Sequence, residues 1–206
     1  METRIAVKLI VEDALSDAVM RRLLTHSSRP FDIHSSLLTH GVSGIKRRIP
    51  VFLNACSVIP HVVLTDLDTA GCAPELLADW RLTRLPAELL FRVAVREVEA
   101  WLLADAEGVA EFLQVPKVKI PVRPETLADP KQALINIARR SRSRRLAAEI
   151  VPPVGSRAQI GPLYNQRLGR FAGEAWSVDR AAQEAPSLAR TLMALDRFVE
   201  GLSRRK

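Results

Sequence analysis

The first hundred residues alternate between short apolar runs and amphipathic segments. Residues 4–11 and 62–64 are almost continuously apolar and rich in β-branched side chains, which predicts strands buried on both faces. Residues 30–36 and 88–95 predict two further strands. Because helical segments lie between these runs, we expect an α/β fold in which a mostly parallel sheet is flanked by helices.

The amphipathic segments have the periodicity of helices. In residues 14–24, apolar side chains recur at helical spacing and leave Asp17 and Arg21 outside the buried stripe. Trp101 belongs to a similar stripe and is expected in the core. Pro50 should limit or kink the helix predicted at residues 45–56. Further helices are predicted at residues 45–56, 74–80 and 97–104.

The composition changes from about residue 108, where prolines become frequent and arginines cluster. Asp129 and Pro130 are typical of the N-cap and first residue of a helix. A final helix is predicted to dock on the body of the protein, with a partner ATPase as the alternative contact; its apolar face carries Leu188, Leu192, Leu195, Phe198 and Leu202. We therefore predict an α/β domain in residues 1–107 and a helical, Arg-rich extension packed on it in residues 108–206.

Acidic residues follow two of the predicted strands. Glu12 comes directly after residues 4–11, and Asp66 and Asp68 end the run that contains residues 62–64. In an extended chain the two aspartates project to the same side, and the carboxyl ends of strands in open α/β sheets form ligand sites. Carboxylates held this close favour a hard cation such as Mg²⁺ or Mn²⁺. The alternative for the aspartates is a solvated turn after a strand.

The charge of the chain predicts an anionic partner. The formal net charge is +7, and nucleic acid is the partner that fits it best, although a protein can also be basic without binding one. Five arginines in seven residues can neutralise several phosphates, with a solvated face as the alternative; they are Arg139, Arg140, Arg142, Arg144 and Arg145. A second basic group is Lys46, Arg47 and Arg48, which follows two glycines. We interpret it as a nucleic-acid contact, with a plain turn before a basic helix face as the alternative.

Several other classes of function are not indicated. The chain is 48% apolar and 26% charged, as in ordinary globular proteins, and no apolar run approaches the length of a membrane span. Cys56 and Cys72 have neither zinc-site nor disulfide-framework spacing, so a cytoplasmic location is expected. The four histidines show no ligand spacing, and neither a nucleophile elbow nor a dinucleotide fingerprint is present.

A Glu that ends the first strand and an Asp-x-Asp that ends a later one resemble the signature of the TOPRIM domain. That domain is a Rossmann-like α/β fold that uses Mg²⁺ in topoisomerases, primases and nucleases of the overcoming-lysogenization-defect type. Residues 95–105, 129–132, 161–165 and 187–190 also resemble, in order, the blocks of one bacterial family. It is the TOPRIM-like domain-of-unknown-function 4276 family, often encoded beside ATPases in phage-defence loci.

The resemblance implies further site residues and also shows a departure. The related nucleases carry an acid in a block like that of residues 95–105, which favours Glu99 over Glu97 as a ligand or base; a first-turn acid stabilised by the helix dipole is the alternative. Lys131 is interpreted either as a stabiliser of a pentavalent phosphoryl group or as a surface lysine. Relatives often carry a second acid four residues after the first, where this chain has Ser16, so Asp17 is the candidate substitute.

The leading hypothesis is a Mg²⁺- or Mn²⁺-dependent nuclease that hydrolyses phosphodiester bonds of DNA or RNA. Glu12, Asp66 and Asp68, helped by Asp17 or Glu99, would hold one or two ions. Lys131 and the arginine cluster would hold the strand. The rival hypothesis is a non-catalytic nucleic-acid-binding or sensor subunit that works with a partner ATPase. Nucleotidyl transfer is a third, but it needs a nucleotide site that the sequence does not indicate.

Overall fold

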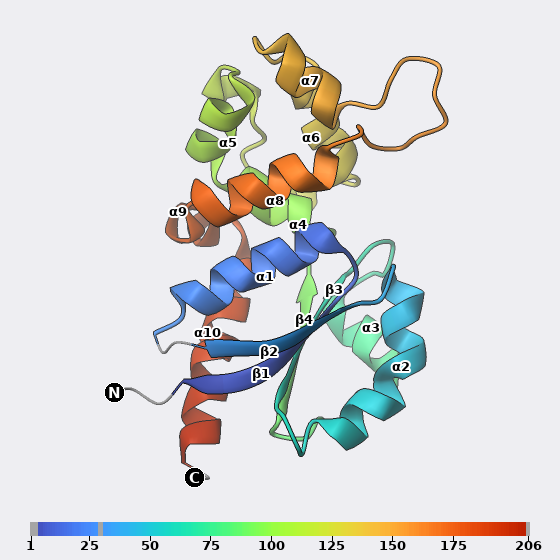
Figure 1. Cartoon of the computed structure of the whole chain (residues 1–206), viewed down its shortest axis with the longest axis vertical. Coiled ribbons are helices and arrows are strands. Elements are labelled where there is room, and N and C mark those ends of the chain that lie inside the picture. The colour runs from blue at the N-terminus through green and yellow to red at the C-terminus, as the bar shows by residue number, and fades with distance from the viewer. Residues whose placement is uncertain (1–3, 29–30, 205–206) are drawn as a thin grey trace.

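A four-stranded parallel sheet forms the centre of the protein. The computed structural model describes residues 4–28 and 31–204, and Pro30, which was predicted to begin a strand, lies outside them. The strands are β1 (Ile5–Val11), β2 (Phe31–Leu38), β3 (His61–Asp66) and β4 (Leu89–Ala94), in the order β2-β1-β3-β4 (Figure 1). All three pairings are parallel. The predicted α/β class, with a parallel sheet flanked by helices, is confirmed.

Helices cover both faces of this sheet (Figure 1). On one face lie α2 (Val42–Ala55) and α3 (Ala73–Asp79), and on the other lie α1 (Ala14–His26) and α4 (Val98–Ala104). Alternating side chains of a strand point to opposite faces, so Val62 and Leu64 join the core beside α1 while Val63 joins the core beside α2. Both cores are therefore built from the same continuous apolar runs.

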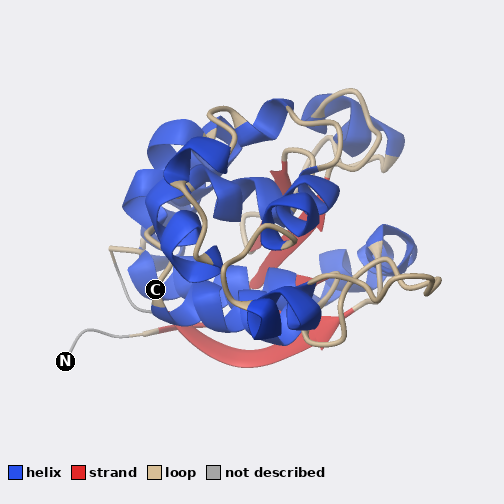
Figure 2. Ribbon diagram, turned by 90° about the horizontal axis from the view of Figure 1, so that it is seen from above, coloured by secondary structure: helices blue, strands red, loops and turns tan. Residues whose placement is uncertain are grey.

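Helices dominate the second half of the chain, and Figure 2, with helices in blue and strands in red, shows how much of the molecule is helical. They are α5 (Ala106–Leu113), α6 (Pro130–Ala138), α7 (Arg144–Ile150), α8 (Tyr164–Glu174), α9 (Val178–Glu184) and α10 (Pro186–Ser203), with 3₁₀ turns η1 (Lys117–Lys119) and η2 (Pro124–Thr126). The core beside α1 continues into α4, α6, α8 and α10. The predicted boundary after residue 107 falls within α5 and stays a prediction.

Local sequence signals explain where several helices begin and end. Asp13 caps α1 by accepting a hydrogen bond from the Ser16 N–H (2.8 Å), and Asp129 caps α6 in the same way from Gln132 (2.7 Å). The prediction for α2 was too short, because this helix begins at Val42 and continues through Pro50. Trp101 is fully buried, as predicted. No helix in residues 4–28 or 31–204 is long and apolar enough to cross a membrane.

Candidate active site at the carboxyl edge of the sheet

The acidic residues singled out in the sequence lie along one edge of the sheet. Glu12 directly follows β1, and Asp66 is the last residue of β3, its neighbour in the sheet. Because the strands are parallel, both carboxyl ends reach the same edge. Asp68 follows in the next loop, and its charge acts on Glu12. The sheet therefore brings together the three acids that were predicted to converge.

Glu12 and Asp66 are joined through the backbone of β3. Glu12 Oε1 accepts hydrogen bonds from Thr65 Oγ1 (2.6 Å) and from the Asp66 N–H (2.8 Å). Burial raises the pKa of Glu12, and the charges of Asp68 and Asp13 raise it further, against these two hydrogen bonds. The two hydrogen bonds therefore hold the Glu12 carboxylate in place, but they do not fully offset the cost of its negative charge.

Asp66 links this edge to the start of α4. Its Oδ1 accepts a hydrogen bond from the Val98 N–H (3.1 Å), in the first turn of that helix. Burial raises the pKa of Asp66 well above its usual value, and the charges of Glu99 and Glu12 add to the effect. Three carboxyl groups from three segments thus repel one another at this point.

Lys131 supplies positive charge to the cluster from the second half of the chain. Its Nζ lies 3.2 Å from Glu97 Oε1 and 3.7 Å from Glu99 Oε1, and its backbone N–H donates to Glu97 Oε2 (3.0 Å). Burial of the ammonium group opposes its charge, but the charges of Glu99, Glu97 and Asp66 prevail and raise the pKa of Lys131. Lys131 is therefore a member of the acidic cluster, and Glu97 belongs to it as well as Glu99.

Tyr164 supports this cluster, and its role was not predicted. Its hydroxyl donates a hydrogen bond to Glu99 Oε1 (2.9 Å), while Glu99 Oε2 has no hydrogen-bond partner among the described residues. Glu99 is 1% exposed, and its burial is the main reason that its pKa rises to about 7. The sequence signals were that Tyr164 is the single tyrosine of the chain and lies in one of the blocks noted above.

The block at residues 187–190 holds the start of α4 in position. Ser187 Oγ accepts hydrogen bonds from Trp101 Nε1 (2.7 Å) and from the Val95 N–H (3.2 Å), and it donates to Glu125. These contacts connect the residue that follows β4 with α4, η2 and α10. We infer that this block has a structural role beside the site, because the helix that Ser187 anchors carries Glu99.

The backbone is strained where three strands leave this edge. His40, Asp68 and Arg96 follow β2, β3 and β4 and have φ angles of 58°, 50° and 30°, which non-glycine residues rarely adopt. The Asp68 N–H donates to the Arg96 carbonyl (3.0 Å), and Arg96 Nη1 donates to the Asp68 carbonyl (3.0 Å). The His40 N–H donates to the Glu12 carbonyl (2.9 Å). Such strain is often found at functional sites, and here it occurs beside Glu12 and at Asp68 itself.

The predicted ligand Asp17 lies in a different environment. Its carboxylate forms an ion pair with Arg21 (2.6 Å) and accepts a hydrogen bond from Ser36 on β2. Ser16, at the position of the second acid, is buried and its N–H is bound by Asp13. The structure therefore gives no support to Asp17 as a substitute ligand, and that assignment stays a prediction.

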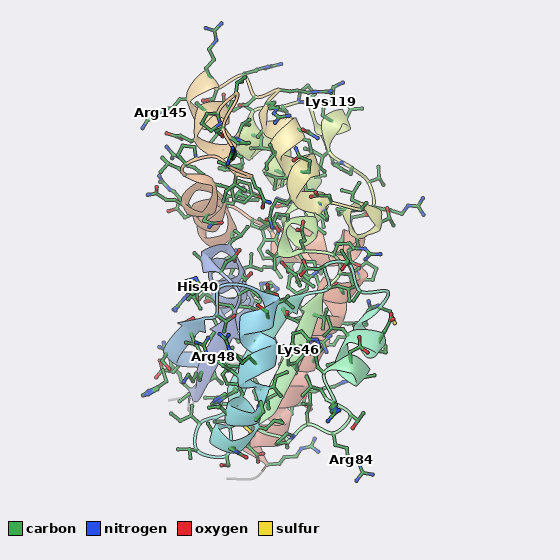
Figure 3. All side chains as sticks on the ribbon, turned by 90° about the vertical axis from the view of Figure 1, so that its right-hand side faces the viewer. His40, Lys46, Arg48, Arg84, Lys119 and Arg145 are labelled. Atoms are coloured by element: carbon green, nitrogen blue, oxygen red, sulfur yellow. The ribbon has the colours of Figure 1, made fainter. Side chains whose placement is uncertain are left out.

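The basic residues form two separate groups (Figure 3). Lys46, Arg47 and Arg48 lie on α2, where Lys46 Nζ is 5.9 Å from the centre of the Trp80 ring. The five arginines of residues 139–145 lie at the connection between α6 and α7, where Arg145 forms an ion pair with Glu149 (3.1 Å). Figure 3 shows Arg145 near the top of the view, and Lys46 and Arg48 well below it, near the middle of the molecule. A single compact patch is therefore not formed.

The chemistry of the acidic cluster fits a hard divalent cation. The available donors are carboxylate oxygens, the pKa values of Glu12, Asp66 and Glu99 are raised, and Glu99 Oε2 is unpaired among the described residues. Within residues 4–28 and 31–204, however, no group of three histidine, cysteine, aspartate or glutamate side chains is arranged to hold an ion. Lys131 supplies the compensating charge in this arrangement. The donors are therefore present, but a complete ligand cage is not preformed.

Replacing Glu99 with glutamine should change the pH dependence of stability. The pKa of Glu99 is raised from 4.5 to about 7, so its contribution to stability is full below its unfolded pKa and is lost as the pH rises through about 7. Glutamine stays neutral, so Glu99→Gln should be more stable relative to wild type at about pH 8.5 than at about pH 5.5, by about 1–3 kcal/mol. Urea unfolding at both pH values measures this, with exposed Glu111→Gln as the control. An equal difference at both pH values would contradict it.

Comparisons with known proteins give one structural likeness. No protein-family model matches the sequence, and no curated protein matches it. A solved structure, the C-terminal region of the Burkholderia pseudomallei OLD protein, is similar over 94% of this chain and 96% of that one, with 16% identity and a TM-score of 0.41. A TM-score this low does not establish a relationship. Membership in the domain-of-unknown-function 4276 family stays a prediction.

Proposed function

We propose that the protein is a Mg²⁺- or Mn²⁺-dependent nuclease that hydrolyses phosphodiester bonds. The observation that carries this proposal is the buried cluster of carboxyl groups with raised pKa values, which Lys131 enters from another part of the chain. Perturbed acids that converge with a lysine at a strained sheet edge are typical of catalytic sites. The proposed setting is phage defence or another nucleic-acid process in a bacterium, together with a partner ATPase.

The residues of the cluster divide into three roles. Glu12, Asp66 and Asp68 would hold the ion, which supplies Lewis-acid polarisation of the scissile phosphate and a more acidic water when it is bound. Glu99, with a pKa of about 7, exists in both protonation states at neutral pH and can accept a proton from the attacking water. Lys131 places a positive charge where the phosphoryl group gains negative charge. Tyr164 orients Glu99 through its hydrogen bond.

A cleavage assay tests the proposal directly. Circular DNA, linear DNA and a structured RNA are incubated with the protein and either Mg²⁺, Mn²⁺ or a chelator. We expect cleavage of at least one substrate with either ion and none with the chelator, because phosphodiester hydrolysis at this site needs the bound cation. Cleavage that persists in the chelator would contradict a metal-dependent mechanism.

The incomplete ligand cage favours one alternative. If the carboxylates never bind a cation, the chain is a nucleic-acid-binding subunit that uses the arginines of residues 139–145. Such a subunit would bind DNA or RNA in a salt-sensitive way and cleave neither, and removing the arginines would weaken binding while removing the acids would not. Cleavage by the isolated protein excludes this alternative.

A further inference from the structure

An opening beside the acidic cluster lies between α6 and the connection from α7 to α8. It has a volume of about 750 Å³ and is lined by α6 and by residues 151–159. Figure 1 shows this connection extending from α7 as a wide loop before it returns to α8. Glu97 and Lys131 line the cavity and also belong to the acidic cluster. The cavity therefore lies next to the candidate active site and shares these two residues with it.

The walls of the cavity combine positive charge with apolar surface. Arg139 lies at the far end of α6, eight residues after Lys131, which is about 12 Å along a helix. Between them Ile135 lies at the base of the cavity and is only 1% exposed, and the facing loop contributes Val151 and Val154, of which Val154 is fully exposed. The acids on this wall already have partners, since Glu97 is bound by Lys131 and Asp129 caps α6. These walls suit a nucleic-acid strand whose phosphates contact Lys131 and Arg139 and whose bases lie against the apolar surface between them.

The dimensions of the cavity select one form of nucleic acid. A volume of about 750 Å³ is in the range of pockets that enclose a single small molecule, so the cavity can hold a short stretch of one strand but is too small to hold a duplex. A duplex therefore cannot enter between α6 and the loop. A single strand, whose unstacked bases can lie against apolar side chains, fits the same space.

We propose that the cavity binds single-stranded nucleic acid, which runs from the acidic cluster along α6 to Arg139. This inference rests on the proposed function and deepens it, because it names single strands, or the single-stranded parts of larger molecules, as the substrate class. Lys131 contacts the phosphate at the acids, and Arg139 contacts a phosphate further along the strand. Residues 151–159 cover the bases between these two points.

Binding measured without cleavage tests this inference. The full-length protein is titrated, in the presence of a chelator, against a fluorescent single-stranded DNA, a single-stranded RNA and a duplex of the same sequence, and anisotropy is recorded. We expect at least one single strand to bind about tenfold more tightly than the duplex. Ala158→Trp fills the cavity from an exposed loop position and should weaken that binding about tenfold, and Arg139→Ala should weaken it several-fold.

Matched variants separate the cavity from general charge and folding effects. Arg84→Ala removes an exposed arginine that the cavity does not include, and Ala148→Trp adds the same bulk on α7; neither residue lines the cavity, so both should bind nearly as wild type. Equal affinity for duplex and single strands, equal effects of each variant and its control, or full displacement by a free mononucleotide at matched nucleotide concentration would overturn the inference.

The failure of this inference is distinguishable from the failure of the proposed function. Cleavage of a duplex by a protein whose strand affinity is unaffected by Ala158→Trp would overturn the single-strand inference and leave the nuclease in place. Cavity-dependent binding of a single strand, with no cleavage in Mg²⁺ or Mn²⁺, would support the inference and remove the nuclease.

Discussion

Replacing Asp66 with asparagine is expected to slow metal-dependent cleavage of nucleic acid by about a thousandfold or more. Burial and the charges of Glu99 and Glu12 raise the pKa of Asp66. A bound cation would offset this repulsion, so the ionised form of Asp66 is the one that it would stabilise most. Asparagine keeps an oxygen that can accept the Val98 N–H but loses the charge that holds the ion. Initial rates with Mg²⁺ and with Mn²⁺ measure the effect.

Two further variants show whether this loss is specific to the site. Asp32→Asn removes an exposed carboxylate on β2 and should cleave as wild type. Asp68→Asn should slow cleavage in the same direction as Asp66→Asn, and asparagine tolerates the positive φ angle of 50° at this position. Thermal unfolding confirms that each variant is folded. An Asp66→Asn or Asp68→Asn protein that cleaves near the wild-type rate would exclude the proposed metal site.

The part of the site that could be predicted from the sequence is the part that parallel strands create. Glu12 and Asp66 are far apart in the chain, but each ends an apolar run, and parallel strands bring such ends to one edge. Lys131 and Tyr164 could not be placed in this way, because each begins a helix in the second half of the chain. Their approach to Glu99 depends on how those helices pack, which no local pattern records.

The prediction for Asp17 shows how one residue changes the direction of a side chain on a helix. Successive residues of an α-helix are rotated by about 100° because there are 3.6 residues per turn. Ser16 is buried, whereas Asp17 lies next to Ser36 and Arg21. The contacts of Asp17 therefore differ from those of the position one residue before it, and its assignment as a ligand stays a prediction. The start of α2 was also missed. The turn that precedes it, at His40 and Gly41 with φ angles of 58° and 106°, has no hydrophobic pattern that marks where the helix begins.

Lys131→Met is expected to lower both stability and activity. Without the ammonium group, Glu97, Glu99 and Asp66 repel one another without compensation, so the free energy of unfolding should fall by about 1–3 kcal/mol at about pH 8.5, where Glu99 is ionised. The loss should be smaller at about pH 5.5, because Glu99 is then protonated. Cleavage should slow by about a hundredfold, since the lysine no longer offsets charge on the phosphoryl group.

The response of this variant to Mg²⁺ separates a cation site from an ordinary ion pair. If Asp66, whose charge also acts on Lys131, binds the ion, Mg²⁺ should stabilise Lys131→Met more than it stabilises wild type, because binding to the folded state alone adds to stability. Lys117→Met is the control: its ammonium lies 2.8 Å from Glu107, both side chains are more than half exposed, and its loss should change stability much less than the loss of Lys131, with no response to Mg²⁺. Equal effects of the two variants, with and without Mg²⁺, would mean that Lys131 forms only a surface ion pair, and the catalytic role proposed for it would then fail.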